Sequence, residues 1–250
     1  MSTHYESLPD VALYTDAFHV PAPVPPVGRA VWPRQPGVFI RVALAAQGEE
    51  VVPAQEVTAA ADAEEAQEAP AAEEGEPAAR AAPQRELATG QFGLVPRWVK
   101  SASDAKLRST KLVNARSETV TTSNNFREAW LAGQRCIVPM MAFTEEDWRS
   151  GKAVPTRIAR VDGKPMGVAA LWESWTGADG SVIVSYTLLT VNANSHALMS
   201  RYQQPGNEKR MLAVLNEGAY DAWLSARPEK AREFMRAYPA NWLTANPVQK

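Results

Sequence analysis

Short apolar runs recur along the chain between turn-forming residues, and this pattern predicts β-strands. A turn at Asp162-Gly163 joins two of these runs, and glycines at 177 and 180 precede another. The predicted strands are 37–45, 91–95, 136–143, 156–160, 166–172, 182–192 and, as the last strand, 211–215.

Helical spacing of apolar positions is confined to short segments near 11–18, around 126–131, and at 217–226 and 228–238. The chain shows no internal repeat, and its strands do not alternate regularly with helices. These features favour an α+β fold over a doubly wound sheet, with the whole of 1–250 forming a single domain.

Residues 54–84 differ in composition from the rest of the chain. They are rich in Ala, Glu and Pro and contain no aromatic residue. Such a segment cannot bury enough apolar surface to offset the entropy of ordering, which predicts a disordered insertion between two strands. A helix in its Ala/Glu-rich middle is the alternative, although that helix would lack an apolar stripe for docking.

The net charge of −2 conceals an uneven distribution. Eight acidic residues and no basic ones lie between Glu56 and Glu76, so the other 20 acidic residues face 26 Lys and Arg. The remaining chain therefore carries an excess of about six positive charges, which is compatible with a nucleic-acid partner.

Three features point to the cytoplasm. No run of about 18 apolar residues predicts a membrane span, and the N-terminus lacks the pattern of a secretory signal. The single cysteine, Cys136, cannot form an internal disulfide, which fits a reducing compartment. Because Cys136 lies in an apolar run, we expect a buried, inert thiol.

Several common functional motifs are absent from the sequence. There is no phosphate-binding glycine loop, no G-x-S-x-G sequence and no cysteine pair. The three histidines, His4, His19 and His196, are far apart in the sequence. We therefore expect no metal site and no cofactor.

Candidate chemistry lies in the stretch 111–148. The polar residues Asn114, Arg116 and Glu118 lead into the short predicted helix, and the apolar run 136–143 ends shortly before Glu145, Glu146 and Asp147. Of these carboxylates, the spacing from Pro139 favours Glu145, and a shift of the register by one residue would select Glu146. Carboxylates at the end of a buried strand lie at the rim of a core, where their protonation can be tuned. A solvated strand end is the alternative.

A second candidate feature is a group of aromatic and basic residues that begins at Arg97 and Trp98. Aromatic side chains beside cations can stack nucleobases and bind phosphates in a single-strand groove. In the alternative, Trp98 belongs to the core and the cations are solvated. The other basic residues of this group are Lys100, Lys106, Arg108 and Lys111.

Ordered sequence blocks extend over nearly the whole chain, apart from the acidic insertion. They read FGLVPRW, KLVNARSET, FREAW, RCIVPMMAF, TLLTVNAN and PGNEKRM, and the chain opens with MSTHY. In this order they resemble the SRAP family, the SOS-response-associated peptidase proteins that act on abasic sites in single-stranded DNA.

The resemblance implies mostly antiparallel strands curled into a barrel-like body with flanking helices and a positive groove for single-stranded DNA. In the family, self-removal of the initiator methionine exposes a cysteine that crosslinks to the abasic-site aldehyde, a chemistry related to hydrolase, protease and lyase activities. Carried over to this sequence, Asn114 positions the reacting groups and Glu145 assists proton transfer. The expected DNA contacts are Arg97, Trp98, Arg116 and Arg201.

Two positions depart from the family pattern. Ser2 stands where the family has its cysteine, and Gln203 stands at the position of a family histidine. A serine hydroxyl is a much weaker nucleophile than a thiolate unless a base activates it. The Ser2 amine can still form an imine with the aldehyde, so we expect at most a reversible adduct. His196 does not match the motif, and we interpret it as a structural histidine.

Two other interpretations remain open at this stage. The chain could be a non-catalytic relative that binds single-stranded or damaged DNA, or an interaction module whose acidic insertion recruits a partner that the sequence does not identify. We expect a monomer in the cytoplasm that associates with the nucleoid when bound to DNA.

Overall fold

The computed structural model describes residues 4–44 and 83–248. By its internal contacts the chain divides into one unit of residues 1–43 and 83–250 and a second unit of residues 44–82. Ser2 and nearly all of the insertion predicted at 54–84 therefore lie outside the described residues.

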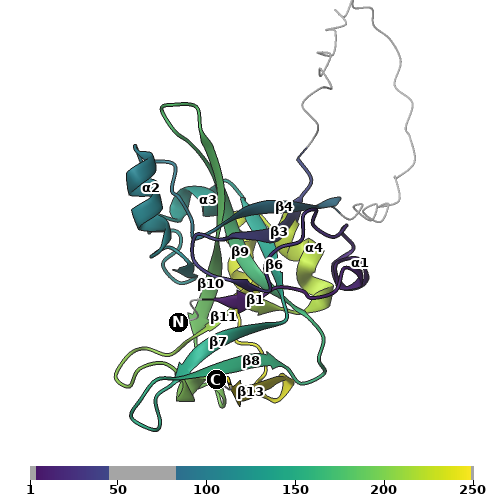
Figure 1. The fold of residues 1–250 in the computed structure, drawn as a ribbon, viewed down its shortest axis with the longest axis vertical. Helices are drawn as coiled ribbons and strands as arrows, with labels where there is room; N and C mark the ends of the chain where they lie inside the picture. The colour runs from purple at the N-terminus through teal and green to yellow at the C-terminus, as the bar shows by residue number, and fades with distance from the viewer. Residues whose placement is uncertain (1–3, 45–82, 249–250) are drawn as a thin grey trace, which may run out of the picture. The chain divides into compact units, whose positions relative to one another are not determined.

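The centre of the first unit is a closed barrel of five strands (Figure 1). Neighbouring strands are antiparallel, except that β10 and β4 pair in parallel where the ring closes. This arrangement confirms the predicted α+β fold with a barrel of mostly antiparallel strands. In their order around the ring the strands are β4 (Arg85–Phe92), β3 (Pro36–Val42), β6 (Arg135–Met140), β9 (Met166–Thr176) and β10 (Val182–Asn192).

Three short strands extend the barrel sheet. Both β5 (Asn114–Arg116) and β11 (Arg210–Leu212) pair with β10, whereas β12 (Val214–Leu215) pairs with β9. The predicted strand 211–215 is thus divided between two partners. It is also not the last strand, because β13 (Leu243–Pro247) follows it.

A second sheet of five strands contains both ends of the described chain (Figure 1). All four pairs of neighbouring strands in this sheet are antiparallel. Its strands, in spatial order, are β13, β8 (Val154–Arg160), β7 (Ala142–Asp147), β1 (Tyr5–Glu6) and β2 (Ala30–Val31).

The prediction of one strand over 136–143 was wrong, because the chain changes sheets at Met141. Its amide donates to the carbonyl of Glu6 (2.9 Å), so the residues before it pair in the barrel and those after it pair with β1 and β8. The turn at Asp162-Gly163 likewise connects two sheets, since β8 and β9 have different partners. An apolar run predicts that a strand is buried, but it does not predict which neighbouring strand each half of the run pairs with.

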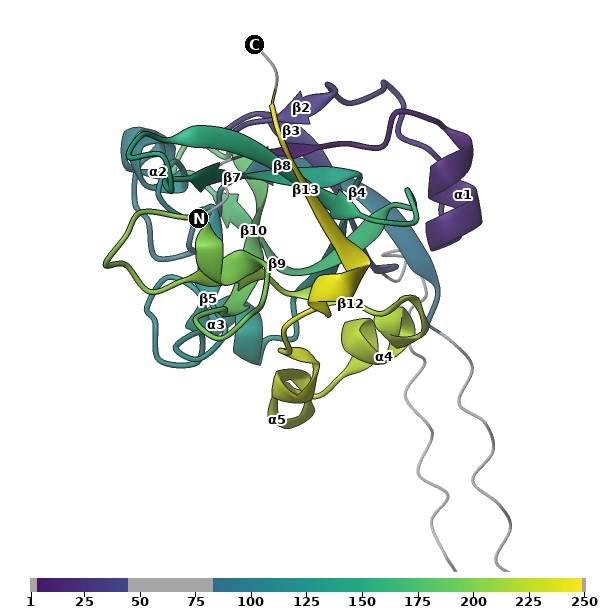
Figure 2. The same cartoon turned by 90° about the horizontal axis from the view of Figure 1, so that it is seen from below.

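The helices are short and lie outside the barrel. Helix α4 packs against β6 and β3, and α4 and α5 lie close together in Figure 2. The segment predicted to be helical at 217–226 forms a 3₁₀ turn followed by α4, and the one predicted at 228–238 starts at Pro228 as expected but ends early, because the backbone leaves helical geometry at Met235. The helices are α1 (Ala12–Phe18), α2 (Ala102–Ser109), α3 (Arg127–Leu131), α4 (Tyr220–Ser225) and α5 (Pro228–Ala231), with 3₁₀ turns η1 (Met199–Arg201), η2 (Glu217–Ala219), η3 (Arg232–Phe234) and η4 (Ala240–Trp242).

Helix α2 was not predicted from the sequence. Ser101 caps it by accepting a hydrogen bond from the amide of Asp104 (3.2 Å), and only Ala105 and Ser109 on the helix are buried. With so few apolar positions, the segment shows no amphipathic stripe. It packs instead beside a small cluster that contains Val99 and Trp175.

Strand β1 is fixed to the barrel by its tyrosine. The Tyr5 hydroxyl contacts the Tyr186 hydroxyl of β10 at 2.5 Å, and both rings are fully buried. Burial raises the pKa of both phenols, so they remain protonated at neutral pH. These contacts hold His4, the residue before β1, beside the edge of β7. None of the described helices is long and apolar enough to cross a membrane.

Candidate functional site

A cleft of about 640 Å³ opens where the second sheet faces the loop that precedes β11. Its walls combine arginines, carboxylates, amides and aromatic rings, so it can contact a ligand that carries both charge and flat rings. The lining residues are His4, Trp32, Arg116, Thr144, Glu146, Trp148, Pro155, Gln203, Gln204, Asn207, Glu208 and Arg210.

A buried arginine organises one wall of the cleft. The guanidinium of Arg210 donates two hydrogen bonds to the carboxylate of Glu118 (3.0 and 2.8 Å) and one to the carbonyl of Thr190 (2.7 Å). It also donates to Glu208 at 3.0 Å. Because its side chain is only 2% exposed, these partners compensate for its desolvation.

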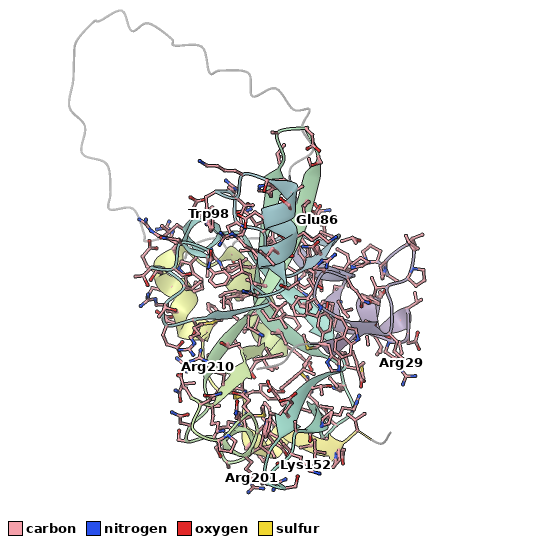
Figure 3. The ribbon with its side chains drawn as sticks, turned by 60° about the vertical axis from the view of Figure 1, so that its left-hand side comes forward. Arg29, Glu86, Trp98, Lys152, Arg201 and Arg210 are labelled. Carbon is pink, nitrogen blue, oxygen red and sulfur yellow. The ribbon has the colours of Figure 1, made fainter. Side chains whose placement is uncertain are left out.

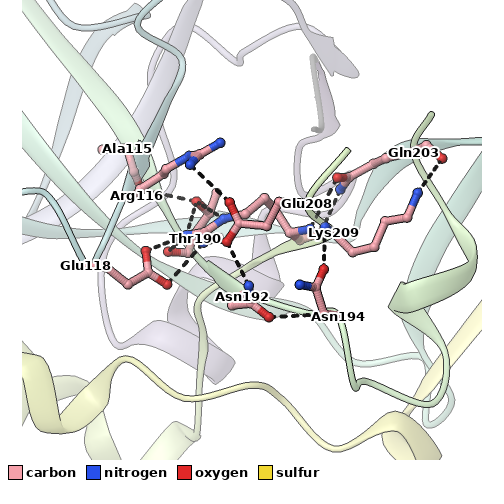
Figure 4. Close-up of polar contacts among 10 residues, drawn as sticks. Ala115, Arg116, Glu118, Thr190, Asn192, Asn194, Gln203, Glu208 and Lys209 are labelled. Atoms are coloured by element: carbon pink, nitrogen blue, oxygen red, sulfur yellow. Dashed lines mark hydrogen bonds and ion pairs between the residues drawn. The ribbon is translucent and has the colours of Figure 1, made fainter. Parts of the chain in front are cut away.

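Glu208 links this wall to Arg116. Its carboxylate accepts from the Asn192 amide (2.7 Å) and lies 3.0 Å from Nη1 of Arg116, as Figure 4 shows. The hydrogen bond from Asn192, followed by that from Arg210, lowers the pKa of Glu208. Burial alone would raise the pKa of Glu118, but its bonds to Arg210 and to backbone amides outweigh burial and lower it.

Strand β5 holds two of the predicted site residues. It pairs with β10 so that Ala115 lies opposite Leu189 and is fully buried. Because side chains alternate along a strand, Asn114 and Arg116 share the other face. The Arg116 side chain is 52% exposed and lines the cleft.

The carboxylates of β7 are separated by the same alternation. Thr144 and Glu146 line the cleft, whereas Glu145 is buried and alternates to the opposite face. Sequence reasoning preferred Glu145 to the adjacent Glu146, whereas the period of two along the strand groups Glu146 with Thr144. Asp147 pairs with Arg149, and this pairing lowers the pKa of the carboxyl.

The side chain of Gln203 is used within the fold. Its amide nitrogen donates to the carbonyl of Arg210 (2.7 Å), and its amide oxygen accepts from the backbone nitrogen of the same residue (3.2 Å). Its own backbone nitrogen donates to the carbonyl of Glu146 (2.7 Å), and its φ of 68° lies in the left-handed region. Gln203 therefore closes the loop that ends at Arg210.

The predicted DNA-contacting residues Arg97 and Trp98 do not line this cleft. Arg97 forms an ion pair with the buried Glu173 at 2.6 Å. The Trp98 indole donates to the carbonyl of Asn124 (3.0 Å), and the guanidinium of Arg108 lies 4.6 Å from the ring centre. Trp98 lines a separate hollow of about 370 Å³ with Asn124, Arg127 and Glu128.

Arg201 is also distant from Trp98. It is exposed at the end of η1, and in Figure 3 Trp98 and Arg201 lie at opposite ends of the described fold with Arg210 between them. The structure thus brings Arg116 and Gln203 into one cleft and leaves Arg97, Trp98 and Arg201 on other surfaces.

Two aromatic rings that sequence reasoning missed form part of the cleft wall. The rings of His4 and Trp32 stack with centroids 3.9 Å apart and an interplanar angle of 12°. Burial lowers the pKa of His4, although the charge of Glu6 opposes this. The two residues flank strands that pair in the sheet but are far apart in the sequence, so no local sequence pattern predicts this contact.

The other residues singled out from the sequence have structural environments. One ring nitrogen of His196 forms a hydrogen bond with the carbonyl of Tyr238 (2.7 Å), and the other accepts from the amides of Leu198 and Met199. These contacts agree with the interpretation of His196 as a structural histidine. Cys136 is confirmed as buried, and burial raises the pKa of its thiol. Within residues 4–44 and 83–248, no three His, Cys, Asp or Glu side chains form a potential metal site.

The described fold is thus a β-rich one, in which a closed barrel carries a second sheet and residues from both sheets line one polar cleft. The family model described as "SOS response associated peptidase (SRAP)" matches residues 38–250. The chain therefore belongs to the SRAP family.

Relatives in other organisms are consistent with this assignment. The abasic site processing protein YoqW of Bacillus subtilis is 28% identical over 162 residues, which cover 63% of this chain and 67% of that protein. The abasic site processing protein HMCES of Gallus gallus is 25% identical over 186 residues, covering 66% of this chain and 53% of that protein.

Solved structures show the same fold. A crystal structure of a Bordetella bronchiseptica protein superposes with a TM-score of 0.78 and is 37% identical, covering 99% of this chain and 100% of that one. A Bacteroides thetaiotaomicron protein with a TM-score of 0.60 and 23% identity, covering 66% of this chain and 70% of that one, shares the fold.

Proposed function

We propose that this protein binds single-stranded DNA and that its N-terminal amine, exposed on Ser2 by removal of Met1, forms a reversible imine with the aldehyde of an abasic site. The observation that carries the proposal is the position of His4 in the wall of the cleft. His4, which immediately precedes β1, lines the same cleft as Arg116. Ser2 lies two residues earlier in the sequence and outside the described residues.

The chemistry follows from the residue at position 2. An α-amine has a pKa of about 7.7–8.0, which leaves a reactive neutral fraction near neutral pH. The amine adds to the aldehyde, and loss of one water gives the imine. Ring closure through the serine oxygen is weaker than closure through a thiolate, so water can reverse the reaction.

A half-exposed arginine and two tryptophans in the cleft support a DNA substrate. The half-exposed guanidinium of Arg116 can bind a backbone phosphate, and Trp32 and Trp148 offer ring surfaces for unpaired bases. Related proteins are named abasic site processing proteins, which agrees with this substrate class.

Borohydride trapping tests the proposal. The protein is incubated with single-stranded DNA that contains one abasic aldehyde, with and without borohydride, and separated on a denaturing gel. We expect a crosslink only in the presence of borohydride, and none with a tetrahydrofuran analogue that lacks the aldehyde. The Ser2→Cys variant is expected to give a heat-stable product without reductant.

Two outcomes would contradict the proposal. A heat-stable crosslink of the unmodified protein without borohydride would show that the adduct is not reversible, and the absence of a trapped product would show that no imine forms. Intact-mass measurement of the purified protein reports whether Met1 is removed.

A second candidate function is binding of single-stranded DNA without covalent chemistry. It is favoured by the serine at position 2 and by the engagement of both polar groups of the Gln203 side chain with the backbone. A native gel run beside the denaturing one separates the two candidates, because a pure binder retards the oligonucleotide on the native gel but gives no trapped product on the denaturing gel.

A further inference from the structure

We propose that His4 is the proton-transfer residue of this cleft and that it moves a proton from the attacking amine to the departing hydroxyl during imine formation. This inference rests on the proposed function. Among the described residues that line the cleft, His4 carries the single imidazole. It also lies two positions after Ser2 in the sequence.

Gln203 lines the same cleft but cannot perform this step. An uncharged amide neither gains nor loses a proton near neutral pH. Its side-chain nitrogen and oxygen are also both hydrogen-bonded to the backbone of Arg210, and the residue is buried, so the side chain is held in place. Its contribution is to fix the loop, which leaves proton transfer to another residue.

The contacts of His4 fix the orientation of its ring. One ring face packs on Trp32 at 3.9 Å, and the backbone carbonyl of His4 accepts from the amide of Thr144 (3.4 Å). Stacking uses the face of the ring and leaves the nitrogens at its edge. Nδ1 is buried and has no hydrogen-bond partner among the described residues. An oriented imidazole nitrogen without a competing partner is suited to general acid-base catalysis.

Burial favours the neutral form of the His4 ring. It lowers the pKa of His4 from its usual value of 6.5, and the charge of Glu6 on the adjoining strand β1 opposes this. Two carboxylates and two guanidinium groups also line the cleft. They are Glu146 on β7, Glu208 in the loop before β11, Arg116 on β5 and Arg210 on β11. Since these offset one another, burial determines the protonation state.

The step balances in atoms and electrons. The nitrogen lone pair of the neutral amine forms a bond to the aldehyde carbon, and the carbonyl electrons move to oxygen. The imidazole removes one proton from the nitrogen, and a solvent water protonates the oxygen to a hydroxyl, which leaves a hydroxide ion. The imidazolium then returns its proton to that hydroxyl, which leaves as water as the carbon–nitrogen double bond forms, and the hydroxide ion removes the remaining N–H proton to give the neutral imine.

The test measures the initial rate of borohydride-trapped adduct as a function of pH for the unmodified protein and for His4→Phe, whose ring can still stack on Trp32. At pH 7 we expect the variant to react about 10²-fold more slowly. Both proteins lose rate as the amine is protonated below about pH 8. Only the unmodified protein has a second, steeper acid limb, which begins below pH 6.5 as His4 becomes protonated.

Two further variants keep the result specific. His4→Ala opens space beside Trp32, and imidazole added to the buffer is expected to restore part of its rate. His19→Asn serves as the matched control, because His19 is exposed at the end of α1 with a φ of 57° that asparagine accepts. It is expected to keep the unmodified rate and to be insensitive to imidazole. Affinity for an oligonucleotide without an abasic site is measured for every variant.

The outcomes separate this inference from the proposed function. Equal rates and equal pH profiles for the unmodified protein and His4→Phe, with no effect of imidazole on His4→Ala, overturn the role of His4 and leave imine formation intact. If the unmodified protein gives no trapped adduct with the aldehyde substrate, the proposed function fails and the role of His4 fails with it.

Discussion

At the scale of single residues, Arg210 connects stability to the cleft. It is almost completely buried and holds Glu118, Glu208 and Thr190 with one guanidinium. The atoms that it joins come from segments as much as 92 residues apart in sequence. A buried cation with this many partners both stabilises the fold and fixes the position of the carboxylate that contacts Arg116.

Replacement of Arg210 by alanine is expected to lower the free energy of unfolding by about 3 kcal/mol, because it breaks a buried ion pair and leaves Thr190 and Glu118 without their donor. Urea denaturation measures the change. Arg149→Ala is the control, since Arg149 also pairs with a carboxylate but is 60% exposed. Its stability is expected to stay near that of the unmodified protein, and equal losses in the two variants would contradict the assigned role of burial.

The same network predicts a pH dependence of stability. The pKa values of Glu118 and Glu208 lie below 4.5 in the folded protein, so the unfolded chain binds protons first as the pH falls. Their stabilisation is complete above pH 4.5 and is lost as the pH falls through the folded pKa values. Denaturation at several pH values should show this loss, and Glu118→Gln should reduce the slope. An unchanged slope would exclude Glu118 as a source.

Glu208 is expected to compete with DNA for Arg116. Its carboxylate already contacts the guanidinium that the proposed function assigns to a phosphate. Glu208→Gln keeps a hydrogen-bonding oxygen for Asn192 but removes the charge, so single-stranded DNA should bind more tightly. Arg116→Ala should bind more weakly and reduce the salt slope by about 0.7.

Fluorescence anisotropy at several salt concentrations measures both variants. The double variant provides the control, because Glu208→Gln should have a smaller effect once Arg116 is absent. If the gain in affinity is the same with and without Arg116, the effect of Glu208 is general repulsion of DNA and not competition for this guanidinium.

At the scale of elements, the short strand β1 is positioned by a glycine on the barrel. A Cβ atom at Gly37 would overlap the Tyr186 hydroxyl and lie 2.7 Å from the Tyr5 hydroxyl. Gly37→Ala is therefore expected to cost about 1–3 kcal/mol and to displace the two tyrosines that hold β1. Thermal unfolding measures the loss. Gly218→Ala, where no atom lies within 4 Å of the added Cβ, should have a much smaller effect.

The elements also show what the sequence could predict. Strand β10 was predicted at 182–192 and forms at Val182–Asn192, because a long apolar run entered through glycines has few alternatives. The change of sheet at Met141 was missed, since it depends on a hydrogen bond to Glu6 far away in the sequence. Helix α2 was missed because a serine cap and two small buried residues replace an apolar stripe.

The candidate site was predictable only in part. The resemblance to SRAP proteins singled out Arg116 and Gln203, which both reach the cleft, but their partners could not be predicted. The stacking of His4 on Trp32 depends on the pairing of β1 with β2. Local sequence patterns predict how side chains alternate along a strand. Contacts between strands of different sheets form only in the folded barrel, so local patterns do not predict them.

At the scale of the whole molecule, the barrel tolerates a long connection between two adjacent strands. Val42 at the end of β3 pairs directly with Arg85 at the start of β4, and the amide of Ala43 donates to the carbonyl of Gln84 (2.8 Å). The two ends of the connection are therefore already neighbours in an antiparallel ladder. A short hairpin turn could join them without a change in the barrel.

Replacement of residues 45–82 by a four-residue turn is expected to preserve the fold and to raise the free energy of unfolding by about 2 kcal/mol, because a shorter loop costs less closure entropy. The change also removes ten acidic residues and one arginine, so single-stranded DNA should bind more tightly at low salt, with a difference that shrinks as salt is added. Denaturation and binding at two salt concentrations measure these effects. A variant that remains folded but loses the borohydride-trapped adduct would show that the replaced segment contributes to the reaction, because neither the loop entropy nor the removed charge would account for that loss.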